Sequence, residues 1–439
     1  MFEMTFFSLH ALPLTLSSYQ DKFSMTEPPT PNRLRFIPFR KRDLVEMCLQ
    51  DGHLAGQEAA FRQLYDMLVS IFHFEFHQIT EMLKDQYAYI DPDSDTQRID
   101  LAAQPASPLT FSELLAGLLD KANYEALSQA DLEQALTEAS LFPIRLQVDF
   151  DEFSEVLLFC RGESIRAESL SSWFGLRRKT IRFTNFDRVV VYLRFRDDLH
   201  QDDTPMPLCK PGATMLKLFQ NVPKADLEML FPNTRVRMRT IDKLLIGVPA
   251  VVSGGIVLTT KVGATLVLLG SLFGFWLGLS SQPVELNRAT ALAVLAGLGT
   301  LGAYLWRQFH NFKTRKLRFM QTLTQNLYFK NLDNNAGVIH RLADDAEEEE
   351  CKEALLAYYF LWLSDEPLSA VELDRRIEQW LETRWRCTID FEISDALNKL
   401  MALELVETCA DQWTAVPLQE GVRRLDRRWD DYFVAARPA

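Results

Sequence analysis

The chain has 439 residues, which predicts about two to four folding units rather than one ordinary domain. Lys+Arg 47 against Asp+Glu 60 gives a formal net charge of -13, and hydrophobic residues make up 47% of the sequence. This composition is typical of globular proteins and excludes collagen-like, disordered and disulfide-scaffold chains. The six cysteines form no C-x-x-C pair, so a zinc or redox motif is unsupported and a reduced, intracellular environment is expected.

Residues 1–31 are expected to form a disordered leader, with translation starting at Met1 or at Met25. Glu3 is the only charge before the short apolar stretch of this leader, which excludes the basic n-region of a secretory signal. The leader also contains no arginine, whereas a transit peptide for an organelle is rich in arginine.

A helical region is predicted over residues 32–140, with a long helix at 57–86 whose apolar residues recur at helical spacing. On that helix His73, His77 and Glu81 lie four residues apart and share a face. Side chains at this spacing converge, which makes them weak candidates for a metal site. The alternative is an ordinary polar face, because no H-E-x-x-H motif is present. No cofactor is predicted.

Residues 141–243 are predicted to form an antiparallel β-rich region with a linker helix, because apolar and polar residues begin to alternate there. The stretch 177–196 is strongly basic. Anionic lipid headgroups are the expected partner of this charge, and a solvated strand face is the alternative. No nucleic-acid partner is predicted, since no stacking-aromatic motif accompanies the basic residues. The headgroup candidates, including basic residues that flank the next segment, are Arg177, Arg178, Lys179, Arg182, Arg235, Arg237, Arg239, Lys313, Arg315 and Lys316.

Residues 244–306 are predicted to be a transmembrane segment with two crossings, or with three if residues 244–260 also cross. The stretches 262–280 and 289–306 carry no charge, and each matches the ~30 Å thickness of a bilayer core. Both flanks are basic, so the positive-inside rule places both termini in the cytoplasm. The sequence thus predicts an integral membrane protein.

Glycines recur inside both predicted spans and favour close packing of helices. They are Gly270, Gly274 and Gly278 in the first span and Gly297, Gly299 and Gly302 in the second. Packing of one span against the other is one interpretation, and self-association of the chain is the second. The last three also match G-x-G-x-x-G, but an apolar span lacks the strand that a dinucleotide site requires.

Residues 307–343 are predicted to be a basic helical connector, and 344–439 a winged-helix-like domain. The latter holds 23 acidic and 11 basic residues, the wrong balance for a DNA phosphate backbone. The acidic run 344–353 is expected to form the first turns of a helix, where negative charge suits the dipole. This helix, two further helices and a hairpin are expected in that order. The fold class is therefore an α+β membrane protein with a helical N-terminal region, a small antiparallel sheet, a transmembrane helical hairpin and a winged-helix-like C-terminal domain.

A family resemblance rests on the passages 36–40 (FIPFR), 72–77 (FHFEFH), Tyr87, 91–93 (DPD), 221–232 (NVPKADLEMLFP), 326–337 (NLYFKNLDNNAG), 350–359 and 395–397. These passages resemble an uncharacterised family that includes transmembrane protein 143 of animal mitochondria. The resemblance covers about residues 35–406. It implies two membrane spans and brings no established catalytic or binding residues. Gln220 departs from the lysine expected there. Because no transit peptide is present, a bacterial plasma membrane or a thylakoid suits the chain better.

The preferred function is a membrane-anchored interaction or regulatory protein with a protein partner or with itself. The alternative is a membrane-associated enzyme acting on a lipid-like or quinone-like substrate. Its candidate residues are His73, His77 and Glu81 on the long helix. A second candidate cluster comprises Asn331, Asp333, Asn334, Asn335 and His340. A series of Asn, Asp and Gly commonly forms a turn between helices, and no catalytic motif supports the enzyme. No catalytic residue is therefore assigned.

Overall fold

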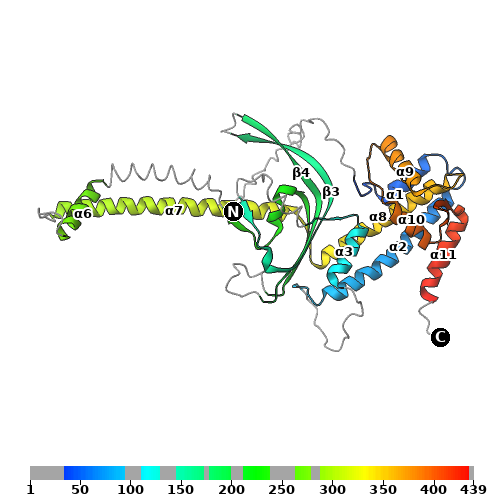
Figure 1. Cartoon of the computed structure of the whole chain (residues 1–439), viewed down its shortest axis with the longest axis horizontal. Coiled ribbons are helices and arrows are strands. Elements are labelled where there is room, and N and C mark those ends of the chain that lie inside the picture. Colours follow the sequence, from blue (N-terminus) through cyan, green and yellow to red (C-terminus); the bar gives the residue numbers. More distant parts are fainter. Residues whose placement is uncertain are drawn as a thin grey trace, which may run out of the picture.

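The structure is a computed structural model, and it describes residues 34–93, 110–128, 145–172, 177–198, 211–237, 263–277 and 287–434. A helical body lies at one end, a curved sheet lies in the middle, and a long helical arm projects from the other end (Figure 1). The predicted leader at 1–31 lies outside the described residues.

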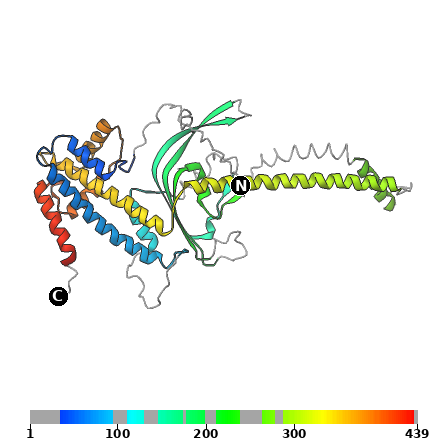
Figure 2. The same ribbon diagram turned by 180° about the vertical axis from the view of Figure 1, so that it is seen from behind.

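Three helices from the N-terminal part enter the body. They are α1 (Lys41–Gln50), α2 (Glu58–Tyr87) and α3 (Phe111–Lys121). The long helix predicted at 57–86 is confirmed by α2, whose apolar stripe is buried against α8 (Ala336–Trp362). The two helices lie side by side in both ribbon views (Figures 1 and 2). Helix α8 is buried along most of its length and forms the centre of the body.

The C-terminal part supplies the remaining helices and a hairpin. Helix α9 begins after Ser369, whose hydroxyl accepts a hydrogen bond from the Glu372 N–H, as its sequence predicts. Helices α8, α9 and α10 and the β8–β9 hairpin follow one another in the order expected for a winged-helix-like domain. The last helix, α11, packs on α2. These elements are α9 (Ala370–Trp385), α10 (Ile393–Ala402), β8 (Val406–Cys409), β9 (Gln412–Ala415) and α11 (Leu418–Val434).

The sheet is antiparallel and has the order β1-β3-β4-β5-β7. The residues at 156–159, 180–184 and 189–195 each have the pattern of a short strand, and the structure merges them into two long strands. The edge strand β7 follows the arm in sequence, so a strand distant along the chain completes the sheet. The bounds are β1 (Glu125–Ala126), β3 (Phe153–Ser172), β4 (Arg177–Phe195), β5 (Thr214–Pro223) and β7 (Asn331–Asn334). A separate pair joins β2 (Arg145–Gln147) to β6 (Arg235–Arg237).

Both faces of the sheet are covered, which explains why its central strands are so apolar. Val190 and Leu218 face the helical body, while their neighbours Val189 and Phe219 face the opposite way. That second face packs on the short helix η4 (Lys224–Leu230) through Leu227. The sheet therefore joins the body to the base of the arm.

The arm consists of α6 (Gly263–Trp276) and α7 (Arg288–Lys330). Its 14-residue α6 extends about 21 Å at ~1.5 Å per residue, short of a ~30 Å bilayer core. Helix α7 has 43 residues, but its apolar first half continues without a break into a strongly basic second half.

No helix among the described residues combines the length and the apolar character needed to cross a membrane. This finding overturns the predicted transmembrane hairpin, the membrane part of the fold class and the integral-membrane localisation with both termini in the cytoplasm. The possible third crossing at 244–260 lies outside the described residues.

Two predicted boundaries also differ from the structure. The basic connector predicted at 307–343 is the second half of α7, then β7, then the start of α8. The acidic run was expected to open a helix at residue 344, but α8 begins at Ala336. The acidic residues therefore lie in the middle of a buried helix.

Candidate functional site

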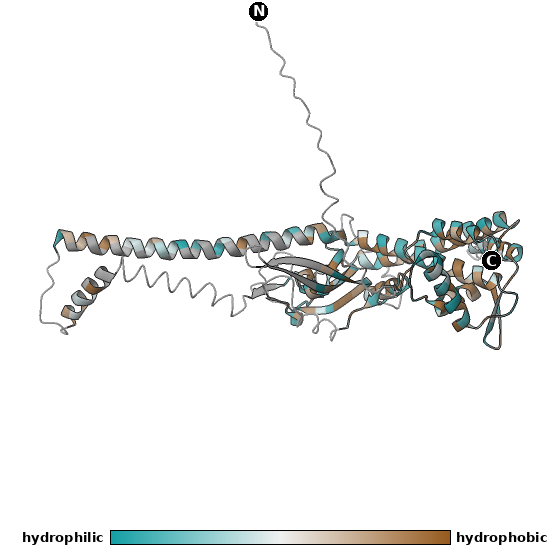
Figure 3. Cartoon of the chain, turned by 90° about the horizontal axis from the view of Figure 1, so that it is seen from above, coloured by the Kyte–Doolittle hydropathy of each residue, from teal (hydrophilic) through white to brown (hydrophobic). Residues whose placement is uncertain are grey.

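The arm carries most of the exposed large apolar side chains found among the described residues. Figure 3 shows apolar positions along α6 and along the outer half of α7. A surface with so many exposed aromatic and aliphatic residues is typical of an interaction site. The residues are Val267, Phe273, Phe275, Trp276, Leu277, Leu292, Leu295, Trp306, Leu317, Tyr328 and Phe329.

Basic side chains accompany this apolar surface. Arg288, Arg307 and Lys313 are exposed on α7, and the predicted headgroup residues Arg315 and Lys316 belong to the same helix. Apolar and basic side chains on one exposed helix are the combination that an anionic lipid surface attracts.

The remaining headgroup candidates lie on the sheet or beside it. Arg177, Arg178 and Lys179 begin β4, and Arg182 on the same strand is exposed. The end of the hairpin where β3 finishes and β4 starts points toward the side from which the arm projects in both ribbon views (Figures 1 and 2). Two further candidates, Arg235 and Arg237, lie in β6, and Arg239 lies outside the described residues.

The glycines of the arm leave room beside the helices. A Cβ atom built on Gly270, Gly274, Gly299 or Gly302 would meet no atom of the described residues within 4 Å. These four positions are therefore open to a helix or to an acyl chain from outside the molecule. Gly297 lies in α7, and Gly278 lies outside the described residues. Packing through these glycines stays a prediction.

The predicted metal candidates on α2, His73, His77 and Glu81, do not converge on a common site. His73 Nδ1 lies 2.9 Å from Glu347 Oε2 of α8. Glu81 accepts a hydrogen bond from Lys84 Nζ, which is the main cause of the lowered pKa of its carboxyl, with His77 and His340 as smaller causes. Within the described residues no group of three His, Cys, Asp or Glu side chains is arranged to hold a metal ion.

The second polar cluster forms a strand and not the expected turn between two helices. Asn331 to Asn334 are β7, which pairs with β5. Asn335 follows with a positive φ of 49°, and its side-chain oxygen accepts a hydrogen bond of 3.0 Å from the Tyr87 hydroxyl. His340 is exposed one turn into α8. The cluster thus fixes the junction between sheet and body.

A network of buried charges in the middle of α8 was not foreseen from the sequence. The acidic run was expected only to form the first turns of a helix, where negative charge suits the dipole. The buried side chains are Glu347, Glu349, Glu350, Lys352 and Glu353. Buried charges persist only where partners neutralise them, and each neighbouring element supplies such partners.

The segment before α1 is held by an ion pair inside α8. Lys352 Nζ lies 2.8 Å from Glu349 Oε1 and donates a hydrogen bond of 2.8 Å to the Ile37 carbonyl. The Ile37 N–H in turn donates to Glu349 Oε2 at 3.0 Å. A few residues further on, Lys41 Nζ lies 2.7 Å from Glu347 Oε1. Residues more than 300 positions apart in the chain are thereby joined.

Lysine residues from α3 and α10 meet the next two carboxylates. Lys399 Nζ lies 2.7 Å from an oxygen of Glu350 and 2.7 Å from one of Glu353. Lys121 Nζ lies 3.1 Å from the other oxygen of Glu350. The Asn123 amide donates to Glu353 at 2.7 Å. Lys399 is buried in this network, although lysine side chains are seldom buried unless paired.

The sheet joins the same network through Arg161 and Arg188. Each guanidinium has a nitrogen 3.8 Å from Asp345 Oδ2. Arg161 also donates to the Ala122 carbonyl at 3.0 Å and lies 4.6 Å from the centre of the Phe36 ring, a cation–π arrangement. The network therefore connects α8 to the sheet as well as to the helices around it.

Glu353 should make the stability of the fold depend on pH. Burial raises the pKa of its carboxyl from 4.5 to about 7, although Lys399 and Asn123 oppose this and Glu349 adds to it. The folded state holds this proton more tightly than the unfolded state, so the resulting stability is complete below pH 4.5 and is lost as the pH rises through 7. The pKa of Lys399 is raised and lies above this window.

In the Glu353→Gln variant a neutral amide replaces the carboxyl group, so no proton is lost at this position. We expect its melting temperature, relative to that of the wild type, to rise steadily from pH 5 to pH 8 in a thermal-unfolding series. Glu350 and Asp395, which also face Lys399, are unchanged in this variant. Parallel curves for the two proteins would contradict the assignment.

A comparison with known families places the arm in a recognised domain. Residues 186–337 match the family described as Protein of unknown function (DUF3754). The DUF3754 domain begins within β4, contains β5, η4, β6, the arm and β7, and ends as α8 starts. The buried network of α8 lies beyond its end. The match does not point to transmembrane protein 143 in particular, and no solved structure matches the chain.

Proposed function

We propose that this chain is an interaction or regulatory protein that anchors its folded body at an anionic lipid surface through the arm of the DUF3754 domain. The observation that carries the proposal is the exposed apolar surface of α6 and α7 beside exposed basic side chains. Apolar burial in the acyl region and attraction to anionic headgroups add up in such an arrangement.

The body fits the role of a rigid carrier. Its central helix is tied to the N-terminal segment by a buried hydrogen bond, and to α3, α10 and the sheet by ion pairs of its carboxylates. The enzyme alternative has less support, because His73 is engaged by Glu347 and Asn331 belongs to a strand.

We also propose that the chain is related to the family that includes transmembrane protein 143. Two of the passages that carry the resemblance, at 221–232 and 326–337, fall inside the DUF3754 domain. The resemblance brings no established catalytic or binding residues, so no residue of this chain receives a role from it.

Flotation of the purified full chain with lipid vesicles tests the anchoring proposal. We expect binding to vesicles that contain phosphatidylserine, weaker binding to neutral phosphatidylcholine vesicles, and loss of binding at high salt. The Trp276→Glu variant should bind about ten-fold less, because a charge replaces an aromatic ring that is 86% exposed. The Val371→Glu variant is the matched control, because Val371 is 78% exposed on α9 of the body.

Two outcomes would overturn the proposal. One is equal loss of binding in both variants, since the arm would then have no special role. The other is absence from every vesicle fraction together with dimers that dissociate in the Trp276→Glu variant during sedimentation. In that case a second copy of the chain covers the arm.

A further inference from the structure

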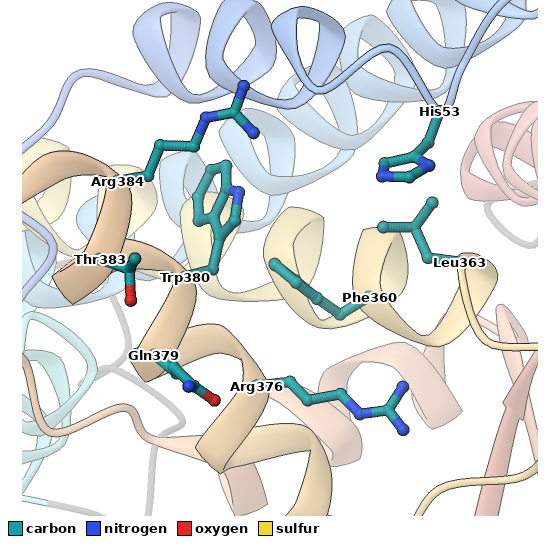
Figure 4. A pocket seen from close by; sticks show the side chains of 8 residues that line it. All are labelled: His53, Phe360, Leu363, Arg376, Gln379, Trp380, Thr383 and Arg384. Carbon is teal, nitrogen blue, oxygen red and sulfur yellow. The ribbon is translucent and has the colours of Figure 1, made fainter.

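A cavity on the helical body lies far from the arm and has no role in the proposed anchoring. Its volume is about 520 Å³, within the range of small-molecule sites. It opens between the loop after α1, the end of α8 and the outer face of α9 (Figure 4). The lining residues are His53, Phe360, Leu363, Arg376, Gln379, Trp380, Thr383 and Arg384.

Three lining residues of α9 are spaced by four and share one helix face. Trp380 lies between Arg376 and Arg384, and Figure 4 shows the two guanidinium groups on opposite sides of its ring. At ~1.5 Å per residue the Cα atoms of the two arginines are about 12 Å apart. A planar group over the indole would therefore have a cation at each end.

The indole of Trp380 is fixed before any ligand arrives. Its Nε1–H donates a hydrogen bond of 2.8 Å to Asp51 Oδ2, which also accepts from the Tyr359 hydroxyl at 3.1 Å. The Phe360 ring packs edge-on against it, with centroids 5.5 Å apart. A fixed aromatic surface binds a planar group at low entropic cost.

The charges of this surface favour an anion. None of the eight lining residues is acidic. Arg376 shares the single carboxylate of Glu372 with Arg375, so two guanidinium groups are balanced by one negative charge. Arg384 is paired with Asp51. The face of α9 that lines the cavity therefore retains positive charge that a ligand can neutralise.

We propose that this cavity binds a small organic anion with a planar ring, in which a phosphate or carboxylate contacts Arg376 and the ring lies on Trp380. Guanidinium forks suit both anionic groups. A nucleoside monophosphate and an aromatic carboxylate share this chemistry, and the experiment separates them.

Isothermal titration of the purified full chain tests the site with four probes. Adenosine monophosphate and 2-naphthoate carry both ring and charge, inorganic phosphate carries only charge, and 2-naphthalenemethanol carries only the ring. We expect at least one of the first two to bind about ten-fold more tightly than either single-feature probe. The tighter of the two identifies the anionic group.

Two variants on α9 locate the binding. Arg376→Gln should weaken the better probe about ten-fold, since a charged hydrogen bond is lost. Arg375→Gln is the control, because it shares Glu372 with Arg376 but does not line the cavity. Equal weakening in both variants would show binding to general surface charge and would overturn the site. Absence of binding by all four probes at millimolar concentration would overturn it as well. Melting temperatures close to that of the wild type verify that both variants are folded.

Discussion

Lys399→Met is expected to lower the free energy of unfolding by about 3–5 kcal/mol, because it leaves buried carboxylates without their cation. The Lys399 side chain is 9% exposed and lies 2.7 Å from both Glu350 and Glu353. Methionine fills a similar volume, so the loss reports the missing charge and not a cavity. Urea denaturation followed by circular dichroism measures it.

Two further variants separate the charge from the packing. In the triple variant Lys399→Met, Glu350→Gln, Glu353→Gln most of the lost stability should return, because no buried uncompensated carboxylate remains around the methionine. Asp395, which also pairs with Lys399, is half exposed and stays hydrated. Arg423→Met is the surface control, since its side chain is 67% exposed beside Glu420, and it should change stability by less than about 0.5 kcal/mol. A Lys399→Met protein as stable as this control would refute the structural role of the network.

The second large effect is expected at Asp51, the residue that follows α1. Asp51→Ala should lower the free energy of unfolding by about 3 kcal/mol, because three donors lose a shared acceptor. Its side chain is 5% exposed, and it accepts hydrogen bonds from Tyr359, Trp380 and Arg384. The same denaturation measurement applies.

Asp43→Ala is the matched control for Asp51→Ala. Asp43 lies in α1, the helix that Asp51 follows, but its side chain is 45% exposed and paired with the exposed Arg40. A change below about 0.5 kcal/mol is expected there. If the two alanine variants were equally stable, Asp51 would not hold α9 and α8 in place.

Local patterns in the sequence predicted several elements well. The apolar spacing of Phe61, Leu64 and Leu68 predicted α2, and all three are buried. The Ser369 to Glu372 capping box predicted where α9 begins. These features depend on residues within one or two helical turns, so they can be recognised without knowledge of the rest of the chain.

The transmembrane prediction failed because counting apolar residues ignores where helices begin and end. The uncharged stretch 262–280 suggested a full span, yet the described helix there is Gly263–Trp276. The second uncharged stretch belongs to a helix that runs on to Lys330. The apolar side chains were recognised correctly, but the geometry of the elements that carry them was not.

The cavity on α9 and the buried network show what local patterns miss. Arg376, Trp380 and Arg384 could have been found as a set spaced by four residues, but nothing local indicated that Asp51 would fix the indole. Glu349 likewise depends on Ile37, 312 positions away. Contacts over such separations leave no periodic signal in the sequence.

The sequence by itself determined the helices, the antiparallel sheet and the apolar, basic-flanked character of residues 244–306. Each follows from side-chain spacing, caps and local charge, which act over a few residues. Only the tertiary structure decided that the acidic run of α8 is buried. A run of carboxylates is stable inside a protein when lysines and arginines from distant segments neutralise it, and folding alone brings Lys41, Arg161 and Lys399 to it.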